Sequence, residues 1–306
     1  MLAASGDQYV ISGGGYTATV TQSGGTLRAL TYAAPAANGA RPLIDGFPED
    51  AVASGGHGQL LMPWPNRIRD GKYAFAGDSY QLGLTEPGRH NASHGLVRWT
   101  SWSPLAQTAD SLTLGYRLMA QSGYPWMLDL AVTYAVDDGG LTVTQSATNR
   151  AATPAPYASG AHPYLRVGAG PLDGWTLELP AQTRLLSDPD RKLPAGREPV
   201  TGTAYDHRRP GPIGVTRWDH GFTDLIRDPD GRATVRLDGP EGAVALWVDE
   251  THHWLMVYTG DDLGVPRSAL AVEPMTAPPD AFNSGEDLIA LQPGESFAAS
   301  WGITAG

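Results

Sequence analysis

Apolar and polar residues alternate with a period of two over long stretches of the chain, the pattern of β-strands with one buried face. The clearest case covers residues 130–136, stops at Asp137-Asp138-Gly139-Gly140 and resumes over residues 141–148. Because Asp and Gly favour tight turns, this stretch predicts a long antiparallel hairpin.

The same pattern recurs on a smaller scale elsewhere. Residues 16–32 predict a hairpin around Ser23-Gly24-Gly25, and residues 72–82 predict another around Gly77-Asp78. The sequence Asp228-Pro229-Asp230-Gly231 is suited to a turn, because Pro fixes φ and Gly accepts a positive φ. Strands are expected on both sides of it, at 225–227 and 234–237, and further along the chain at 243–248, 254–258, 270–273 and 297–304.

Helices are expected to be few and short. No window of a dozen residues keeps an apolar period of 3.6 free of glycine and proline. The chain has 38 glycines and 25 prolines, which cost a helix interior about 1 and 3 kcal/mol each. The predicted fold class is therefore all-β, a large antiparallel β-sandwich, and the absence of a repeat or a linker predicts a single domain over residues 1–306. Residues 187–212, rich in Pro, Arg and Asp, are expected to form a long loop.

Charge restricts the partners that the chain is expected to bind. It has 21 basic and 32 acidic residues, and the net charge of −11 repels nucleic acid and anionic membranes. We therefore expect no nucleic-acid partner and no membrane partner. No run of 18 apolar residues is present, and residues 1–7 lack the organisation of a signal peptide, which favours a cytoplasmic location.

Composition excludes chemistry that depends on cysteine and does not decide the role of the aromatic residues. There is no cysteine, hence no disulfide framework, no thiol nucleophile and no cysteine-bound metal. Nine Trp and twelve Tyr outnumber five Phe. Aromatic rings with a polar group are suited to stacking on sugars, and equally to an ordinary β core.

Four segments combine polar side chains with restricted backbone. In the first, Pro63 and Pro65 constrain the chain just before Asn66 and Arg67. Both side chains are suited to hydrogen bonding a hydroxyl-rich ligand. A structural ion pair is the alternative for Arg67.

The second segment holds His90 and His94, with Gly95 directly after them. An imidazole beside a glycine at a strand edge leaves room for a ligand, although His94 is equally suited to a structural role. The spacing of the two histidines would allow a zinc pair, but no third ligand follows at a recognisable spacing, and we predict no metal site.

The third segment centres on His162. The following Pro163 favours an extended backbone, so the ring is expected to project from a strand or loop. Tyr157 and Tyr164 are candidates for the walls of a pocket, and we assign Tyr164 to substrate binding. A histidine in this setting is suited to donate a proton, with a structural role as the alternative.

The fourth segment ends an apolar run with Glu273, followed by Pro274. A carboxylate at the rim of a core needs a partner or a function. Burial would raise its pKa toward that of a general base. An ion pair with Arg67 is the alternative.

Other motifs contribute little. No nucleophile elbow, phosphate loop or dinucleotide fingerprint stands in a strand–turn–helix context, and Ser12-Gly13-Gly14-Gly15 predicts only a turn. His252-His253 lacks the spacing of a zinc protease. Two histidines, a glutamate and an arginine on separate β segments remain, a set suited to moving protons on a neutral substrate.

Taken together, the segments resemble the aldose 1-epimerase (galactose mutarotase) family. Six stretches carry the resemblance in the family's order: Pro65-Asn66-Arg67-Ile68 with a Gly-Lys-Tyr hairpin after it, Ser93-His94-Gly95, His162-Pro163-Tyr164, Trp218-Asp219-His220-Gly221-Phe222, Val272-Glu273-Pro274-Met275 and Leu291-Gln292-Pro293-Gly294-Glu295-Ser296-Phe297. Each is weak alone, and their order over most of the chain makes the set specific.

The resemblance implies a fold and a reaction. The fold is a β-sandwich of the large supersandwich kind, with a sugar cleft on one sheet. Glu273 matches the base that takes the proton of the anomeric hydroxyl, and His162 matches the acid that protonates the ring oxygen. The ring opens to an aldehyde and closes again as the other anomer.

The resemblance also implies how the substrate is held. Asn66, Arg67 and Asp219 match sugar-binding positions, and His94 matches a position that assists at the ring oxygen. The implied substrate is a monosaccharide, a free aldohexose such as glucose or galactose, with no cofactor and no metal. We expect a monomer or a homodimer.

Departures from the family pattern bear on the substrate. Pro163 stands where many members have Thr or Ser, and Leu165 where Phe is common. Arg89 and Arg98 add positive charge near His94, which keeps an anionic sugar, and with it a hexose-phosphate 1-epimerase, as an alternative. Pairing of Arg98 with surface acids is the other interpretation. A non-catalytic carbohydrate-binding protein is disfavoured because both residues of the acid–base pair are present.

Overall fold

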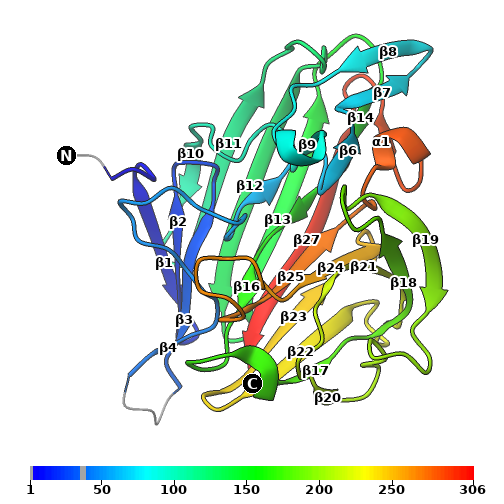
Figure 1. Cartoon of the computed structure of the whole chain (residues 1–306). Helices are drawn as coiled ribbons and strands as arrows, with labels where there is room; N and C mark the ends of the chain where they lie inside the picture. Colours follow the sequence, from blue (N-terminus) through cyan, green and yellow to red (C-terminus); the bar gives the residue numbers. More distant parts are fainter. Residues whose placement is uncertain (1–2, 35–38) are drawn as a thin grey trace.

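Antiparallel strands dominate the computed structural model, which describes residues 3–34 and 39–306 (Figure 1). Strands account for 48% of the residues and helices for 3%, so the all-β prediction is confirmed. Within the described ranges the helical segments are α1 (Ala281–Ser284) and two 3-10 turns, η1 (Pro87–Arg89) and η2 (Leu172–Gly174). The expectation of few, short helices is likewise confirmed.

The largest sheet has nine strands. In spatial order they are β10 (Ser103–Gln107), β11 (Ser111–Leu118), β12 (Leu128–Asp137), β13 (Gly140–Asn149), β27 (Ser296–Ala305), β23 (Gly242–Val248), β22 (Ala233–Gly239), β17 (Thr176–Glu178) and β20 (Gly211–Pro212). The predicted β12–β13 hairpin is confirmed, with its register running from Leu128 opposite Asn149 to Asp137 opposite Gly140. Alternate residues of both strands are buried, because every second side chain points to the inner face.

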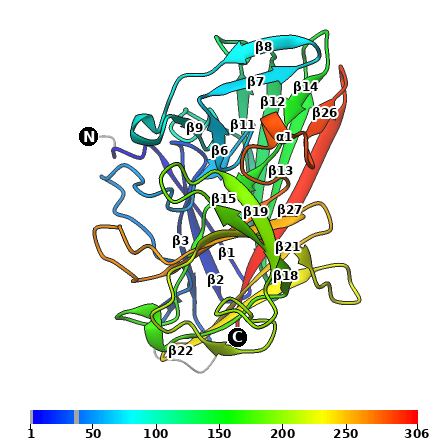
Figure 2. The same ribbon diagram turned by 45° about the vertical axis from the view of Figure 1, so that its right-hand side comes forward.

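A second sheet of eight strands carries most of the residues of interest. Its strands are β19 (Pro194–Pro199), β18 (Ala181–Ser187), β21 (Asp219–Leu225), β24 (Trp254–Tyr258), β25 (Leu270–Met275), β15 (Gly160–Ala161) and β5 (Leu60–Leu61), with β16 (Tyr164–Leu165) also paired to β25. All six residues of β25 are buried. The two layers can be followed in Figures 1 and 2.

Four small sheets complete the fold. One has four strands, in the order β1 (Gln8–Gly13), β2 (Tyr16–Thr21), β3 (Leu27–Tyr32) and β4 (Arg41–Pro42). The other three are pairs: β6 (Arg67–Arg69) with β9 (Asn91–Ser93), β7 (Lys72–Phe75) with β8 (Asp78–Gln81), and β14 (Ala155–Tyr157) with β26 (Ile289–Leu291). The predicted hairpins over 16–32 and 72–82 are confirmed. The second turns at Ala76-Gly77, one residue earlier than expected, with both residues at positive φ.

Two sequence-based expectations need correction. The turn at 228–231 forms, but the strands on either side, β21 and β22, lie in different sheets, because β21 pairs with β18 and β24. A turn signal is local and does not determine which strands pair. Residues 187–212, expected as a loop, include β19 and β20 at the edges of the two large sheets.

Tryptophan fills the core. Six of the nine Trp side chains are fully buried: Trp64, Trp102, Trp175, Trp218, Trp254 and Trp301. Only Trp99 among the nine is largely exposed, at 54%. The excess of Trp therefore packs the interior, and the interpretation as a sugar-stacking surface is wrong for these side chains.

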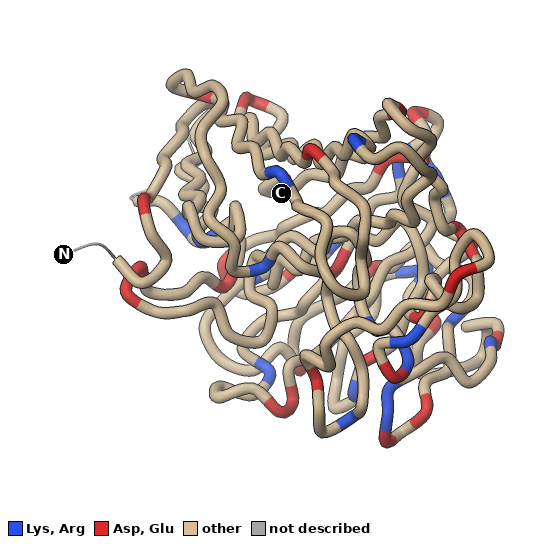
Figure 3. The backbone as a smooth tube through the Cα atoms, turned by 90° about the horizontal axis from the view of Figure 1, so that it is seen from above, with Lys and Arg blue, Asp and Glu red and all other residues tan. Residues whose placement is uncertain are grey.

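The surface is mixed in charge. Acidic and basic residues are interspersed around the molecule (Figure 3).

Among the described residues, no helix has the length and hydropathy needed to cross a bilayer.

Candidate active site

A cavity of about 310 Å³ opens on the eight-stranded sheet, a size at the lower end of the roughly 300–1,000 Å³ of small-molecule sites. It is lined by Gly55, Gly56, Asn66, Arg67, Thr85, Glu86, Arg89, Ser93, His94, Arg98, His162, Asp219, Met256, Tyr258, Asp262, Leu263 and Glu273. Six of the seven predicted site residues are in this set. The exception is Tyr164.

Glu273 lies on β25, opposite Met256 of β24, and is 2% exposed. Its Oε1 is 3.2 Å from Nε2 of His162. No ion pair with Arg67 forms, because the Arg67 guanidinium binds Glu86 instead. Burial first, and then the Asp219 charge, raises the pKa of Glu273 well above its usual value, while Arg67 opposes the shift.

His162 sits in the short connection between β15 and β16 and is 5% exposed. Its backbone N–H donates to Gln59 O at 3.0 Å, and its carbonyl accepts from Gly58 N–H at 2.9 Å. Burial first, and then the His57 charge, lowers the pKa of His162 to about 3. Since Nδ1 has no hydrogen-bond partner among the described residues, the ring's polar contact is the one with Glu273.

The opposite shifts have a joint consequence. A raised carboxyl pKa and a lowered imidazole pKa mean that Glu273 and His162 together hold one proton between them over a wide pH range. A pair with one proton can accept a proton at one residue and donate a proton at the other.

His94 is a hydrogen-bond donor toward the cavity. Its backbone has a φ of 60°, and its Nδ1 accepts from the backbone N–H of Asn66 at 3.2 Å. An N–H can only donate, so the ring proton of neutral His94 must be on Nε2. Burial and the neighbouring His162, Arg98 and Arg67 charges hold the pKa of His94 well below its usual range, which keeps the ring neutral.

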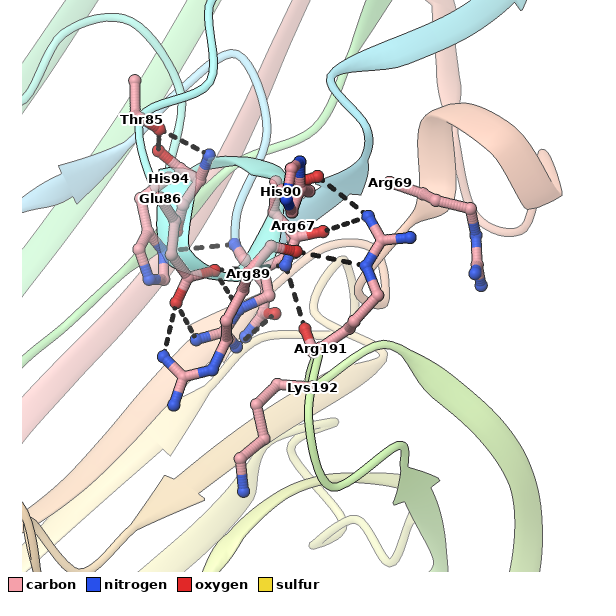
Figure 4. A network of polar contacts seen from close by, with 12 residues as sticks. Arg67, Arg69, Thr85, Glu86, Arg89, His90, His94, Arg191 and Lys192 are labelled. Atoms are coloured by element: carbon pink, nitrogen blue, oxygen red, sulfur yellow. Dashed lines mark hydrogen bonds and ion pairs between the residues drawn. The ribbon is translucent and has the colours of Figure 1, made fainter.

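Arg67 belongs to a network of polar contacts (Figure 4), and Asn66 is hydrogen-bonded to it. Arg67 binds Glu86 through two hydrogen bonds, of 2.8 and 3.0 Å, and donates to Oδ1 of Asn66 at 3.3 Å. Arg89 adds a third hydrogen bond to Glu86, at 2.9 Å. Asn66 therefore has its side-chain NH₂ group left for a ligand, because its amide oxygen is occupied.

Asp219, at the start of β21, is held by a lysine from the loop before β19. Lys192 Nζ lies 3.1 Å from Asp219 Oδ2. The adjacent Arg191 fixes this loop by donating to Asp70 Oδ1 at 2.7 Å and to the carbonyl oxygen of His90 at 2.8 Å. The segment predicted as a loop thus supplies a cation that orients a cavity carboxylate.

Tyr164 supports His162 from behind. Its ring stacks on His162 with centroids 4.9 Å apart and on His57 at 4.0 Å. Its hydroxyl donates to the carbonyl oxygen of Gly55 at 2.6 Å. In contrast to the sequence-based assignment, Tyr164 is not among the residues that line the cavity, and its ring and hydroxyl are engaged by His162, His57 and Gly55.

The structure adds lining residues that the sequence analysis did not single out. Glu86, Met256 and Tyr258 are among them. Their local sequence carries no chemical signal, because the segment before η1 and strand β24 reach the same cavity only in the folded chain. Arg98, by contrast, was singled out, and it makes no ion pair with any described carboxylate. The interpretation that it pairs with surface acids is wrong.

Among the described residues, no group of three or more His, Asp or Glu side chains is placed to hold a metal ion.

Comparison with known proteins agrees with this geometry. The family described as "Aldose 1-epimerase" matches residues 7–304, almost the whole chain. The chain belongs to the aldose 1-epimerase family.

Relatives within this aldose 1-epimerase family differ in how much is known of them. The chain is 33% identical to the uncharacterized protein YihR of Escherichia coli K12 over 293 residues, 95% of this chain and 91% of that one. It is 29% identical to human galactose mutarotase over 219 residues, 67% of this chain and 63% of that one.

Solved structures of similar proteins share the fold. A GalM/aldose epimerase homologue from C. elegans superposes with a TM-score of 0.85 at 21% identity, covering 98% of both chains. A putative aldose 1-epimerase from Escherichia coli K12 gives a TM-score of 0.83 at 23% identity, covering 98% of this chain and 99% of that one. The expected galactose mutarotase-like β-sandwich is therefore confirmed.

Proposed function

We propose that this protein is an aldose 1-epimerase that interconverts the α and β anomers of an aldohexose, with free glucose and galactose as the first candidates. The observation that carries the proposal is the contact of 3.2 Å between Glu273 and His162 at a cavity of about 310 Å³. A carboxylate and an imidazole that share one proton are suited to act on two oxygens of one sugar.

The reaction uses the arrangement of the shared proton in which Glu273 is ionised and His162 is protonated. This is the less populated of the two arrangements, because the raised pKa of Glu273 and the lowered pKa of His162 favour the proton on Glu273. Glu273 takes the proton of the anomeric hydroxyl while His162 gives its proton to the ring oxygen, and the C1–O5 bond breaks. The products are an open-chain aldehyde, a protonated Glu273 and a neutral His162. Rotation about C1–C2 exposes the other face of the carbonyl, and the two proton transfers in reverse close the other anomer.

Three further groups are suited to hold the sugar. The Nε2–H of neutral His94 donates toward the ring-oxygen side, next to His162, whose ring centroid is 5.6 Å away. The Asn66 NH₂ and the Asp219 carboxylate supply a donor and an acceptor for hydroxyl groups. No step in this scheme requires a metal or cofactor.

The decisive experiment is polarimetry of freshly dissolved α-D-glucose and α-D-galactose, with protein, with buffer alone and with the E273Q variant. We expect the wild-type protein to accelerate equilibration of at least one sugar and E273Q to match buffer closely. If no aldose, free or phosphorylated, equilibrates faster than in buffer, the enzymatic proposal is wrong, and a carbohydrate-binding role takes its place.

A hexose-phosphate 1-epimerase is the second candidate. It is favoured by Arg98, which lines the cavity and has no carboxylate partner among the residues described. The acid–base chemistry would be the same for both substrates, because it involves only C1, its hydroxyl and the ring oxygen.

A further inference from the structure

One side of the cavity carries more positive than negative charge. We call it the cationic wall and define it as Thr85, Glu86, Arg89, Ser93 and Arg98. Hydrogen bonds connect much of it: Arg89 donates to Glu86 at 2.9 Å, and both Thr85 Oγ1 and Arg98 Nη2 donate to the carbonyl oxygen of Ser93, at 3.2 and 3.3 Å.

The single carboxylate of the cationic wall serves two arginines. Glu86 accepts from both Arg67 and Arg89, and this sharing lowers the pKa of Glu86 despite its burial. Arg67 lies outside the cationic wall, on β6, and shares this carboxylate with Arg89, so Glu86 is not left for Arg98.

Arg98 carries the positive charge that is in excess within the cationic wall. It is half-buried, its guanidinium carbon lies 4.2 Å from the centre of the Trp99 ring, and its buried Nε has no partner among the described residues. Burial lowers the pKa of Arg98 to about 10, so it remains charged at neutral pH. Arg98 also lines a neighbouring cavity of about 350 Å³, which leaves space beside its side chain.

The other acids of the cavity do not neutralise the cationic wall. Asp219 is paired with Lys192, and Asp262 accepts from the Tyr258 hydroxyl. Asp219 and Tyr258 are at the ends of β21 and β24, whereas the cationic wall is built from the two residues before η1, from η1 itself, from β9 and from the segment after β9. The local excess of positive charge is notable in a chain with a net charge of −11.

Arg98 lies on the ring-oxygen side of the proposed site. Its Nη2 donates to the carbonyl oxygen of Ser93 at 3.3 Å, and Ser93 directly precedes His94, whose ring centroid is 5.6 Å from that of His162. His94 and His162 are the two groups proposed to face the ring oxygen. In a hexopyranose the ring oxygen is bonded to C5, which carries C6. With the sugar placed as proposed, a substituent at C6 therefore lies on the side of Arg98.

We propose that the cationic wall binds an oxyanion at C6 of the sugar through Arg98 and Arg89, so that the preferred substrates are aldohexoses with a phosphate, sulfate or carboxylate group at C6. This inference rests on the proposed epimerase function and names its substrate class. The oxyanion accepts hydrogen bonds from guanidinium N–H groups that no described carboxylate occupies.

The test compares five sugars by exchange NMR between the two anomeric protons at equilibrium, at one ionic strength. Glucose and galactose are neutral, and glucose 6-phosphate, glucose 6-sulfate and glucuronate carry the three candidate anions. We expect at least one anionic sugar to have a kcat/KM tenfold or more above that of glucose. The three arms distinguish phosphate, sulfate and carboxylate as the source of the anion.

Variants connect this preference to Arg98. In R98Q, we expect the ratio of anionic to neutral kcat/KM to fall at least tenfold, and in R98K to be partly retained. The ratio is the informative quantity, because any effect of Arg98 on His162 alters all substrates and cancels. R117Q is the matched control, since Arg117 pairs with Asp129 on the nine-stranded sheet, and its ratio should equal that of the wild type.

The outcomes separate the two proposals. If glucose or galactose reacts faster than all three anionic sugars, or if R98Q leaves the ratio intact, the oxyanion site is wrong and the epimerase function stands. If no sugar reacts, the epimerase function fails, and calorimetric titration with glucose 6-phosphate, glucose 6-sulfate and glucuronate then decides on the oxyanion site. The oxyanion site is supported if at least one of the three anionic sugars binds the wild-type protein and binds R98Q at least tenfold more weakly. It is wrong if none of them does.

Discussion

At the residue scale, the chemistry depends on which atoms have a partner within the protein. Oε1 of Glu273 contacts His162, whereas its buried Oε2 has no hydrogen-bond partner among the described residues. An unpaired carboxylate oxygen in a dry environment is unfavourable unless a ligand hydroxyl reaches it. Oε2 is accordingly the oxygen of Glu273 that has no partner within the described residues and remains available to accept a proton.

Replacing Glu273 by Gln preserves shape and removes the proton acceptor. We expect kcat to fall by about 10²–10⁴, the usual contribution of a positioned acid or base, with KM changing less than about threefold. H162N should lose at least about 100-fold for the corresponding reason. Both are measured by polarimetry, and a rate close to wild type in E273Q would assign the base to another residue.

The pH dependence of kcat/KM follows from the shared proton. A second proton enters the pair only as the pH falls through the His162 pKa of about 3, and it blocks Glu273 as an acceptor. The single proton is lost as the pH rises through the raised pKa of Glu273, which removes the donor. We therefore expect kcat/KM not to fall between pH 7 and pH 5, where an ordinary imidazole with a pKa of about 6.5 becomes protonated.

The measurement is polarimetry in buffers of equal ionic strength, with circular dichroism confirming that the protein stays folded. A tenfold loss of kcat/KM between pH 7 and pH 5 in folded protein would show that His162 titrates like an exposed histidine.

At the scale of elements, loops outside the strands position the site. Residues 54–58 pass beside His162, and Gly56 has a φ of +84°. A Cβ at Gly56 would lie 2.5 Å from Cδ2 of His162, closer than van der Waals contact permits. The loop can therefore approach the imidazole only with glycine at this position.

G56A should displace His162 and lower kcat at least tenfold. G202A is a matched control, because Gly202 has a similar φ of +77° and no atom within 4 Å of its added Cβ. Both variants should lose about 1 kcal/mol of stability from backbone strain, G56A should lose more because of its overlap with His162, and only G56A should lose activity. Thermal unfolding and polarimetry measure the two effects, and equal activity in both variants would contradict the crowding argument.

At the scale of the whole molecule, one buried side chain joins the two large sheets under the site. Gln145 of β13 donates to the carbonyl oxygen of Gly160 in β15 at 3.0 Å and accepts from Nε1–H of Trp301 in β27 at 3.1 Å. Gly160 lies two residues before His162. The nine-stranded sheet thus contributes to the position of His162, although none of its strands lines the cavity.

Q145L removes both hydrogen bonds while preserving an apolar side chain of similar size. We expect a loss of about 1–3 kcal/mol in the free energy of unfolding, because the Gly160 oxygen and the Trp301 N–H stay buried without partners. Urea unfolding measures it. Q107L, at an exposed position of the edge strand β10, should stay within about 0.5 kcal/mol of wild type, and an equally small effect in Q145L would contradict the proposed link.

The sequence by itself determined the fold class and most strands, because alternation, turn residues and the lack of a helical period are local properties of the chain. Its motifs also identified six candidate site residues that line one cavity: Glu273, His162, His94, Asn66, Arg67 and Asp219. The turn at 228–231 shows the limit of local signals, since it forms as predicted between strands of different sheets.

Only the tertiary structure decided which charged and aromatic groups are partners. Arg67 pairs with Glu86 and not with Glu273, Tyr164 supports His162 from behind, and Arg98 has no carboxylate partner among the described residues. The physical reason is that ion pairs, stacking and desolvation act over a few ångströms in space, between residues that lie far apart in the chain until the strands pair. The charge available to a substrate is therefore a property of the folded cavity, and the composition of the chain does not reveal it.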